Sequence, residues 1–150
     1  MIVYRISNEL YKEDISGNGA SINGSRWNSK SVKMLYTGEY ISLTILESLV
    51  HLRNIDIPAN QYLLTIQIPE IEQQDIKLSK LKDKWQQHLS YTQWIGDQFV
   101  LAGQSLILKI PSVVVPQEHN FLINPLHKDF KKVKIVNSEL LELDKRLLMQ

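Results

Sequence analysis

Three side chains in the first third of the sequence could act together on a phosphate-bearing ligand. Arg26 follows a stretch of small residues, residues 17–24, and Tyr36 and Glu47 come after it. A guanidinium matches phosphate oxygens in a two-pronged geometry, an aromatic ring can stack on a flat heterocycle, and a carboxylate can stabilise a developing positive charge. These are the groups needed to hold a dinucleotide and to cleave its glycosidic bond.

Each of the three residues also has a purely structural explanation. Arg26 could be a surface arginine whose stem lies on Trp27, and Tyr36 could belong to the core. Glu47 has mostly apolar neighbours in the sequence, and a carboxylate in such surroundings needs either a partner or a function. The structural partner would be His51, one helical turn further on. Residue type alone leaves both explanations open.

A second group of polar residues lies further along the chain. Ser112 follows Pro111 at the start of an apolar run, and Asn120 and Asn124 surround an apolar turn before Pro125. These side chains could contact a ligand, but turn and capping residues that satisfy backbone groups have the same composition. Their spacing does not decide between the two roles.

The elements that must position these residues are predicted from periodicity and turn composition. Residues 2–6 form a short strand, residues 17–24 a shaped loop whose glycines and asparagines can take positive φ angles, and residues 32–36 a buried strand. Residues 39–53 form a helix, and residues 62–68 form a half-buried strand.

The predicted helix at residues 39–53 has two distinct faces. Its apolar stripe consists of Ile41, Ile45, Leu49 and Leu52. Polar residues gather on the opposite arc, namely Thr44, Glu47, Ser48 and His51. We therefore expect the apolar stripe to face the core and Glu47 to share a face with the other polar residues.

The second half of the chain adds further helices and strands. Ser79 can cap a helix that runs to about residue 89, and Thr92 can cap another that ends near residue 103. Strands are predicted at residues 106–110, with a continuation through residues 112–115, and at residues 130–136. Strands outnumber helices without regular alternation, so we expect one α+β domain over residues 1–150, with a curved, mainly antiparallel sheet and flanking helices.

The composition excludes several classes of protein. The 17 lysines and arginines nearly balance the 16 aspartates and glutamates, so we expect no direct binding of nucleic acid. The absence of cysteine excludes disulfides and thiolate catalysis and is compatible with a cytoplasmic protein. The histidines lack a metal-binding spacing, and no phosphate-loop or nucleophile-elbow motif occurs, so we expect no metal. No segment reaches ~18 uninterrupted apolar residues, so we expect no membrane span.

Taken together, these pieces resemble the RES domain. The motifs that carry the resemblance occur in order along nearly the whole chain: Tyr4-Arg5-Ile6, Ser25-Arg26-Trp27-Asn28, Leu35-Tyr36, Leu46-Glu47, Trp94-Ile95-Gly96-Asp97, Pro111-Ser112, Asn124-Pro125-Leu126-His127 and Asp144-Lys145-Arg146-Leu147. The chain departs from the usual family pattern at Ser25, where glycine is more usual, and at Lys128, where proline is more usual. Neither departure removes a proposed catalytic group.

The resemblance implies both a fold and an activity. RES-domain proteins are toxins of bacterial toxin–antitoxin pairs, their fold is similar to that of ADP-ribosyltransferases, and characterised members deplete cellular NAD by hydrolysis or phosphorolysis. Carried over by motif, Arg26, Glu47 and Ser112 would be the arginine, glutamate and serine for which the family is named, and Tyr36 would be its active-site tyrosine. The family's asparagine would fall on Asn120 or on Asn124.

The implied roles agree with the chemistry of the residues. Arg26 would bind the diphosphate of NAD, Tyr36 would stack near nicotinamide, and Ser112 with one of the asparagines would hydrogen-bond the adjoining ribose or the amide. Glu47 would stabilise positive charge at the anomeric carbon as nicotinamide leaves. NAD is therefore expected as a substrate, and no cofactor is implied.

The sequence does not decide which molecule reacts with the ribose after nicotinamide leaves. Water would make the protein an NAD glycohydrolase, phosphate an NAD phosphorylase, and a protein side chain an ADP-ribosyltransferase. A non-catalytic nucleotide-binding module is a further alternative. The family implies a cognate Xre-type antitoxin that blocks the cleft and provides any DNA binding, and the sequence leaves a homo-oligomer open.

Overall fold

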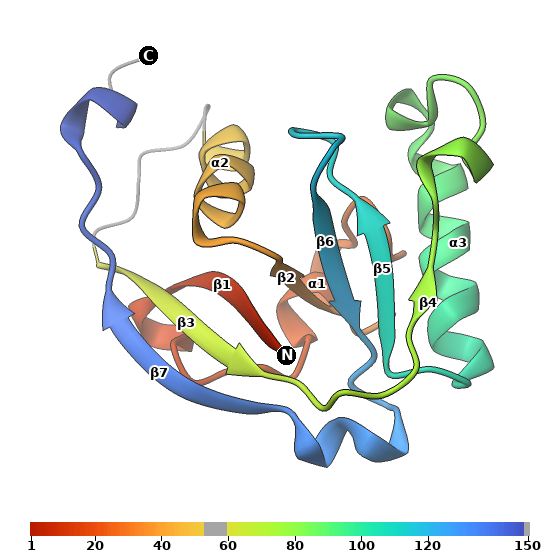
Figure 1. Cartoon of the computed structure of the whole chain (residues 1–150), viewed down its shortest axis with the longest axis horizontal. Coiled ribbons are helices and arrows are strands. Elements are labelled where there is room, and N and C mark those ends of the chain that lie inside the picture. Colours follow the sequence, from red (N-terminus) through yellow and green to blue (C-terminus); the bar gives the residue numbers. More distant parts are fainter. Residues whose placement is uncertain (53–59, 149–150) are drawn as a thin grey trace.

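The computed structural model describes residues 1–52 and 60–148, in which the strands form one strongly bent sheet (Figure 1). The strands are β1 (Ile2–Asn8), β2 (Leu35–Gly38), β3 (Gln61–Gln67), β4 (Gln74–Asp75), β5 (Ile107–Pro111), β6 (His119–Ile123) and β7 (Lys134–Leu140). The α-helices are α1 (Asn18–Asn23), α2 (Ile41–Leu52) and α3 (Leu89–Ala102). Short 3-10 turns occupy Glu9–Tyr11, Leu78–Lys80, Trp85–Gln87, Lys128–Lys132 and Lys145–Leu148.

The strand order across the sheet is β4-β5-β6-β2-β1-β3-β7. Among the described strands, every pairing is antiparallel except that of β4 with β5. The α+β class and the mainly antiparallel sheet predicted from the sequence are therefore confirmed. The order also makes β1, β2 and β6 consecutive neighbours, although they are far apart in the sequence.

Two clusters of buried side chains cover opposite faces of the sheet. The first consists of Val3, Leu35, Leu64, Ile66, Ile68, Leu106, Ile107, Phe121, Ile123 and Val133. The second consists of Trp27, Met34, Trp85, Phe99, Val100, Leu108, Ile110 and Leu122. Successive residues of β5 and β6 alternate between the clusters, as the two-residue period of a strand requires. Both faces of the sheet are therefore buried at β5 and β6, which explains the nearly continuous apolar sequence of these two strands.

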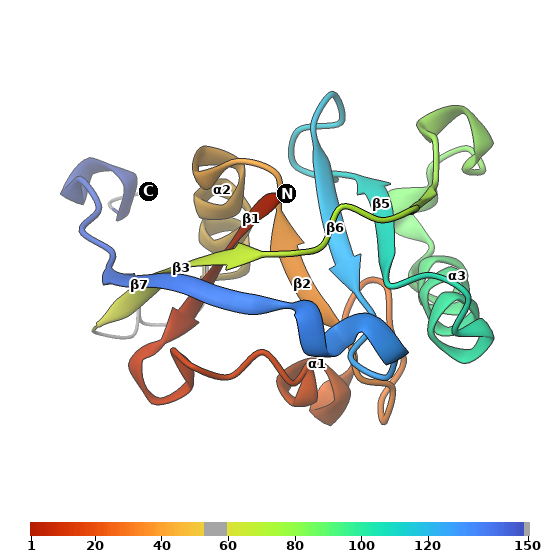
Figure 2. The same cartoon turned by 60° about the horizontal axis from the view of Figure 1, so that its bottom comes forward.

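The two longer helices occupy different places along the sheet (Figures 1 and 2). Through Phe99 and Val100, α3 packs into the second cluster beside β5. By contrast, α2 contacts β1 and β2 and lies in the angle between the two splayed halves of the sheet (Figure 1). None of the helices in the described part of the chain has the length and apolar character needed to cross a membrane.

The structure corrects two predictions near the N-terminus. Residues 18–23 of the predicted loop form α1, and the expected positive φ angles occur at its ends, 74° at Gly17 and 73° at Gly24. The predicted strand at residues 32–36 begins only at Leu35. The preceding backbone is instead held in turns, because the Val32 amide donates to the Ser29 carbonyl at 3.1 Å.

The polar arc of α2 is confirmed, but its buried face differs from the prediction. Thr44, Glu47, Ser48 and His51 all line one cavity. The buried positions in the helix are Leu43 and Thr44, whereas Ile41 of the predicted stripe is 40% exposed. The reason is that α2 lies in the bend of the sheet, where its polar face points into a cavity instead of bulk solvent. The predicted helix end at Arg53 lies outside the described residues.

The predicted helices between residues 79 and 103 are also displaced. Residues 79–88 form 3-10 and other turns and no α-helix, because Lys84 has a left-handed φ of 53° that no α-helix accommodates. The next helix, α3, begins at Leu89, so Thr92 lies inside it and is not its cap. The Thr92 hydroxyl instead donates to the Arg26 carbonyl at 2.5 Å.

Two further strand predictions are wrong in their limits. The chain does not continue as a strand after Pro111, because the Ser112 hydroxyl accepts hydrogen bonds from the Val114 and Val115 amides at 3.0 Å and closes a turn. The strand β6 follows, where the sequence suggested only a turn. Residues 130–136 are only partly extended, since His127 caps a 3-10 helix and β7 starts at Lys134.

Leu64→Ala tests the first cluster. The Leu64 side chain is 0% exposed, so its truncation should lower the free energy of unfolding by about 2–5 kcal/mol. Leu10→Ala is the matched control, because Leu10 is 83% exposed and its truncation should change stability by less than about 0.5 kcal/mol. Denaturant unfolding measures both variants, and equal effects would contradict the assignment of the core.

Candidate active site

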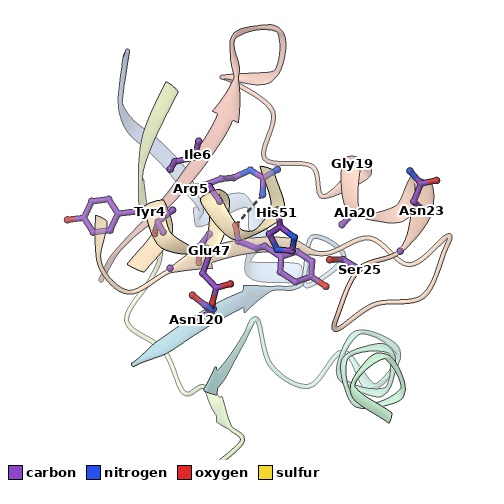
Figure 3. A pocket seen from close by; sticks show the side chains of 16 residues that line it. Tyr4, Arg5, Ile6, Gly19, Ala20, Asn23, Ser25, Glu47, His51 and Asn120 are labelled. Atoms are coloured by element: carbon purple, nitrogen blue, oxygen red, sulfur yellow. Dashed lines mark hydrogen bonds between the residues drawn. The ribbon is translucent and has the colours of Figure 1, made fainter. Parts of the chain in front are cut away.

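A cavity of about 390 Å³ opens where β1, β2 and β6 meet α1 and α2 (Figure 3). Its volume lies within the range of small-molecule sites. The lining residues are Tyr4, Arg5, Ile6, Gly19, Ala20, Asn23, Gly24, Ser25, Tyr36, Thr37, Gly38, Thr44, Glu47, Ser48, His51 and Asn120. The cavity wall thus includes a cation, an aromatic residue and a carboxylate.

Glu47 is held in this wall through one of its two carboxylate oxygens. Ser112 Oγ and Asn120 Nδ2 each donate to Glu47 Oε1 at 2.7 Å. Within residues 1–52 and 60–148, Oε2 of Glu47 accepts no hydrogen bond and is not one of the buried polar atoms that lack a partner. It is therefore available to a ligand in the cavity. His51, the partner considered from the sequence, forms no ion pair with Glu47 in the described chain. Figure 3 shows the Glu47 and Asn120 side chains facing one another.

Ser112 orients Glu47 and does not itself line the cavity. Its side chain is fully buried at the turn after β5. The hydroxyl oxygen accepts hydrogen bonds from the Val114 and Val115 amides, and its single proton is donated to Glu47. The turn therefore fixes the direction of the hydroxyl and, through it, the position of the carboxylate.

The two candidate asparagines lie at opposite ends of β6. Asn120 lines the cavity and binds Glu47. Asn124 is fully buried beyond the other end, where its amide donates to the Val100 carbonyl at 3.4 Å and its Oδ1 accepts from the Leu126 amide at 2.9 Å. The structure brings Asn120, and not Asn124, to the cavity.

Tyr36 contributes its ring to the cavity and its hydroxyl to the neighbouring loop. The hydroxyl donates to Asn28 Oδ1 at 2.6 Å and accepts from the Trp27 amide at 3.0 Å. Burial raises the pKa of Tyr36 far above its usual value. The hydroxyl therefore stays protonated at neutral pH and holds the loop in place.

Arg26 lies in that loop but does not line the cavity. Its Nη1 donates to the Gln86 carbonyl at 2.9 Å, in the 3-10 turn Trp85–Gln87. Its charge nevertheless acts on the Tyr36 hydroxyl, in the direction that lowers the pKa of that group. The guanidinium is thus near the Tyr36 edge of the cavity and is turned towards a backbone carbonyl.

The arginine that does line the cavity is Arg5 of β1, which the analysis of single residues missed. Its Nη1 donates to the Tyr36 carbonyl at 3.2 Å, and its buried Nε has no partner in the described part of the chain. Burial lowers the pKa of Arg5, and nearby Asp14 opposes this shift. A buried N–H without a partner is costly, and an anionic ligand would supply one. The available signal was a charged residue inside a short, otherwise apolar strand.

The cavity therefore offers a desolvated cation, a ring and an oriented carboxylate with one free oxygen. Such a set can bind an anion and a flat ring and can stabilise positive charge that develops beside the carboxylate. Among the described residues, no cluster of three His, Asp or Glu side chains could hold a metal ion.

Tyr36→Phe tests the role of the hydroxyl, because it keeps the ring. It leaves the Trp27 amide and Asn28 Oδ1 without their partner, so it should lower the free energy of unfolding by roughly 1–3 kcal/mol.

Because the pKa of Tyr36 is raised in the folded state, the unfolded chain loses this proton first, and stability falls as the pH rises above about 10. Denaturant unfolding at about pH 8 and about pH 11 should show a smaller fall for the variant than for the native protein. An identical fall would contradict the assignment.

Comparison with known proteins places the chain among relatives of similar length. Residues 2–144 match the RES domain family. Toxin Res of Photorhabdus laumondii is 34% identical over 135 residues, which cover 88% of this chain and 86% of that protein. The Prs ADP-ribosylating toxin of a Sphingobium species is 35% identical over 127 residues, which cover 81% of this chain and 79% of that protein.

The fold also occurs in a solved structure. A chain of the crystal structure of the M. tuberculosis MbcT–MbcA toxin–antitoxin complex superposes with a TM-score of 0.77, over 93% of this chain and 83% of that chain. Its sequence identity is only 15%, so this likeness concerns the fold. The match over nearly the whole chain, together with the identity to Toxin Res, shows that the protein belongs to the RES domain family.

Proposed function

We propose that this protein is the toxin of a bacterial toxin–antitoxin pair and that it cleaves the bond between nicotinamide and ribose in NAD. Relatives named Toxin Res and Prs ADP-ribosylating toxin support a toxin that uses an ADP-ribosyl donor. The observation that carries the proposal is the Glu47 carboxylate, oriented by Ser112 and Asn120 in a cavity that also contains Arg5.

Glu47 acts on the reacting carbon in this proposal. When the nicotinamide–ribose bond lengthens, positive charge develops at the anomeric carbon, and Oε2 of Glu47 is free to face it or to accept a hydrogen bond from a ribose hydroxyl. Ser112 and Asn120 hold the carboxylate in place before the reaction, so no reorganisation is needed when the charge appears. Nicotinamide leaves as a neutral molecule from a cationic ring, so no general acid is required.

The diphosphate lies towards the arginines. Arg5 is already buried in the cavity wall with one unpartnered N–H, which suits it to an anionic group. Arg26 reaches the same ligand by exchanging its bond to the Gln86 carbonyl for a phosphate oxygen. Tyr36, which also lines the cavity, offers its ring as a face for the nicotinamide.

The acceptor defines the product. We favour water or inorganic phosphate, which gives NAD hydrolysis or phosphorolysis and arrests growth by depletion of NAD. Transfer to a protein side chain is the second candidate, and it is favoured by the relative whose name states ADP-ribosylation of Prs. Chromatography of the products formed from NAD, with and without phosphate and with a candidate protein acceptor, distinguishes these outcomes. Absence of any turnover, with nucleotide binding retained, would indicate a binding module.

A cognate antitoxin of the Xre type is the proposed partner. The structural relative was solved as a toxin–antitoxin complex, which supports an antitoxin partner for this chain. The net charge of +1 gives this chain no overall electrostatic attraction for DNA, so any DNA binding is indirect and belongs to the complex. A mobility shift of DNA by the isolated chain at physiological salt would contradict this assignment.

Glu47→Gln tests the proposed chemistry. The amide keeps nearly the same shape but removes the negative charge, so turnover of NAD should fall by about 10²–10³-fold with little change in NAD affinity or melting temperature. The variant should no longer arrest growth when expressed in cells. Glu13→Gln, an exposed change, is the control and should retain full activity. If Glu47→Gln unfolds the protein while residual folded material remains fully active, Glu47 is only a structural residue.

Arg5→Gln and Arg26→Ala test the proposed diphosphate contacts. A phosphate contact exists in both the ground state and the transition state, so each change should raise KM for NAD by roughly 10- to 100-fold and leave kcat nearly unchanged. Arg26→Lys should restore the affinity only in part, because an ammonium lacks the planar fork. Arg146→Ala, at an exposed arginine paired with Asp144, is the control. An unchanged KM with a reduced kcat would exclude a phosphate role for the altered arginine.

A further inference from the structure

The motif at residues 94–97 belongs to the RES pattern, yet no residue of α3 lines the cavity. We infer that one face of α3, formed by Thr92, Gln93, Gly96 and Asp97 and named here the α3 clamp, positions the loop of residues 25–29 and thereby sets the affinity of the cavity for its substrate. The inference rests on the proposed function and adds positioning residues to it.

Two residues of the clamp hold consecutive backbone carbonyls of the loop. Thr92, which is fully buried, donates its hydroxyl proton to the Arg26 carbonyl at 2.5 Å. Gln93 donates its side-chain amide to the Ser25 carbonyl at 2.9 Å. Ser25 itself lines the cavity, so this bond acts directly on its wall.

Asp97 holds the far end of the same loop. Its Oδ1 accepts from the Ser29 amide at 2.9 Å, and its Oδ2 accepts from the Ser29 hydroxyl at 2.5 Å. Both are hydrogen bonds to a charged acceptor, which are stronger than neutral ones. One carboxylate thus fixes both the backbone and the side chain of Ser29.

Gly96 allows the helix and the loop to come this close. A Cβ atom at this position would lie 1.6 Å from the Trp27 carbonyl oxygen, so no side chain fits without movement of the backbone. Thr92 and Gly96, like Gln93 and Asp97, are four residues apart and therefore share one face of the helix. The clamp is a continuous surface whose contacts cover residues 25, 26, 27 and 29.

The opposite side of the loop is held by Tyr36, whose hydroxyl binds the Trp27 amide and the Asn28 side chain. The loop is therefore fixed between α3 and the ring that lines the cavity. Glu47 is held separately, by Ser112 and Asn120. Loosening the clamp should consequently change the binding of substrate at the Arg26 side and leave the chemical step at Glu47 intact.

Thr92→Val and Thr92→Ser give the sharpest test. Valine keeps the shape of the side chain but removes the donor to the Arg26 carbonyl, whereas serine retains a hydroxyl. Thr92→Val should raise KM for NAD by about 10-fold while kcat changes by less than about 2-fold, and Thr92→Ser should restore most of the affinity. Gln98→Ala, at an exposed residue of α3, is the control and should leave both constants unchanged. An unchanged KM in folded Thr92→Val overturns the inference.

A second pair of variants covers the possibility that Thr92→Val fails to fold. Asp97→Ala and Ser29→Ala remove the two sides of one contact, so their effects on KM should be clearly less than additive in the double variant. Fully additive effects would show that Asp97 does not act through Ser29.

Amide hydrogen exchange over residues 25–29 separates this inference from the proposed function. Exchange should accelerate in Thr92→Val and return towards the native rate in Thr92→Ser, whether or not the native protein turns over NAD. If the native protein does not cleave NAD, the proposed function fails, and the exchange data alone decide whether α3 holds the loop. Unchanged exchange in Thr92→Val rejects the clamp.

Discussion

The site depends on one carboxylate oxygen, Glu47 Oε1, which accepts hydrogen bonds from Ser112 and Asn120 at 2.7 Å each. These bonds join α2 to the β5–β6 hairpin, through Ser112 in the turn after β5 and Asn120 near the start of β6. A partly buried carboxylate is costly unless donors satisfy it. Here the donors are neutral, so the charge is oriented but not cancelled, and the second oxygen stays available to a ligand.

The rest of the cavity complements this charge without neutralising it. Arg5 and Glu47 both line the cavity, but no ion pair joins them in the described part of the protein. An anion near Arg5 and a developing cation near Glu47 would each meet a fixed opposite charge. Water is a weaker competitor in such a partly enclosed site than at the surface, so these interactions are stronger there. A ligand that carries both a diphosphate and a reacting ribose has this pattern of charge.

The part of the cavity wall formed by Ser25 and Tyr36 is positioned by residues that do not line the cavity themselves. Trp27 and Asn28 are buried, and their polar groups bind the Tyr36 hydroxyl, while the carbonyls of the two preceding residues, Ser25 and Arg26, bind α3. This part of the wall therefore owes its shape to a partly buried network of hydrogen bonds. This organisation explains why residues of a helix outside the cavity belong to the same sequence pattern as the residues inside it.

The sequence by itself determined the fold class, the strands near residues 2–6 and 62–68, the helix that carries Glu47 and the polar arc on which Glu47 lies. These features follow from local periodicity, which the pattern of apolar and polar residues records. The ordered series of short motifs also indicated the family, which the match over residues 2–144 confirms.

Only the tertiary structure decided which residues meet. Asn120 and Asn124 are equivalent in sequence, but the pairing of β6 with β2 and β5 brings one to Glu47 and buries the other beside Val100. Likewise, the strand order places Arg5 of β1 in the cavity, while the packing of the loop turns Arg26 towards Gln86. Strand pairing joins residues far apart in the chain, and the direction of a hydrogen bond depends on every neighbour of its donor, so local sequence patterns contain neither.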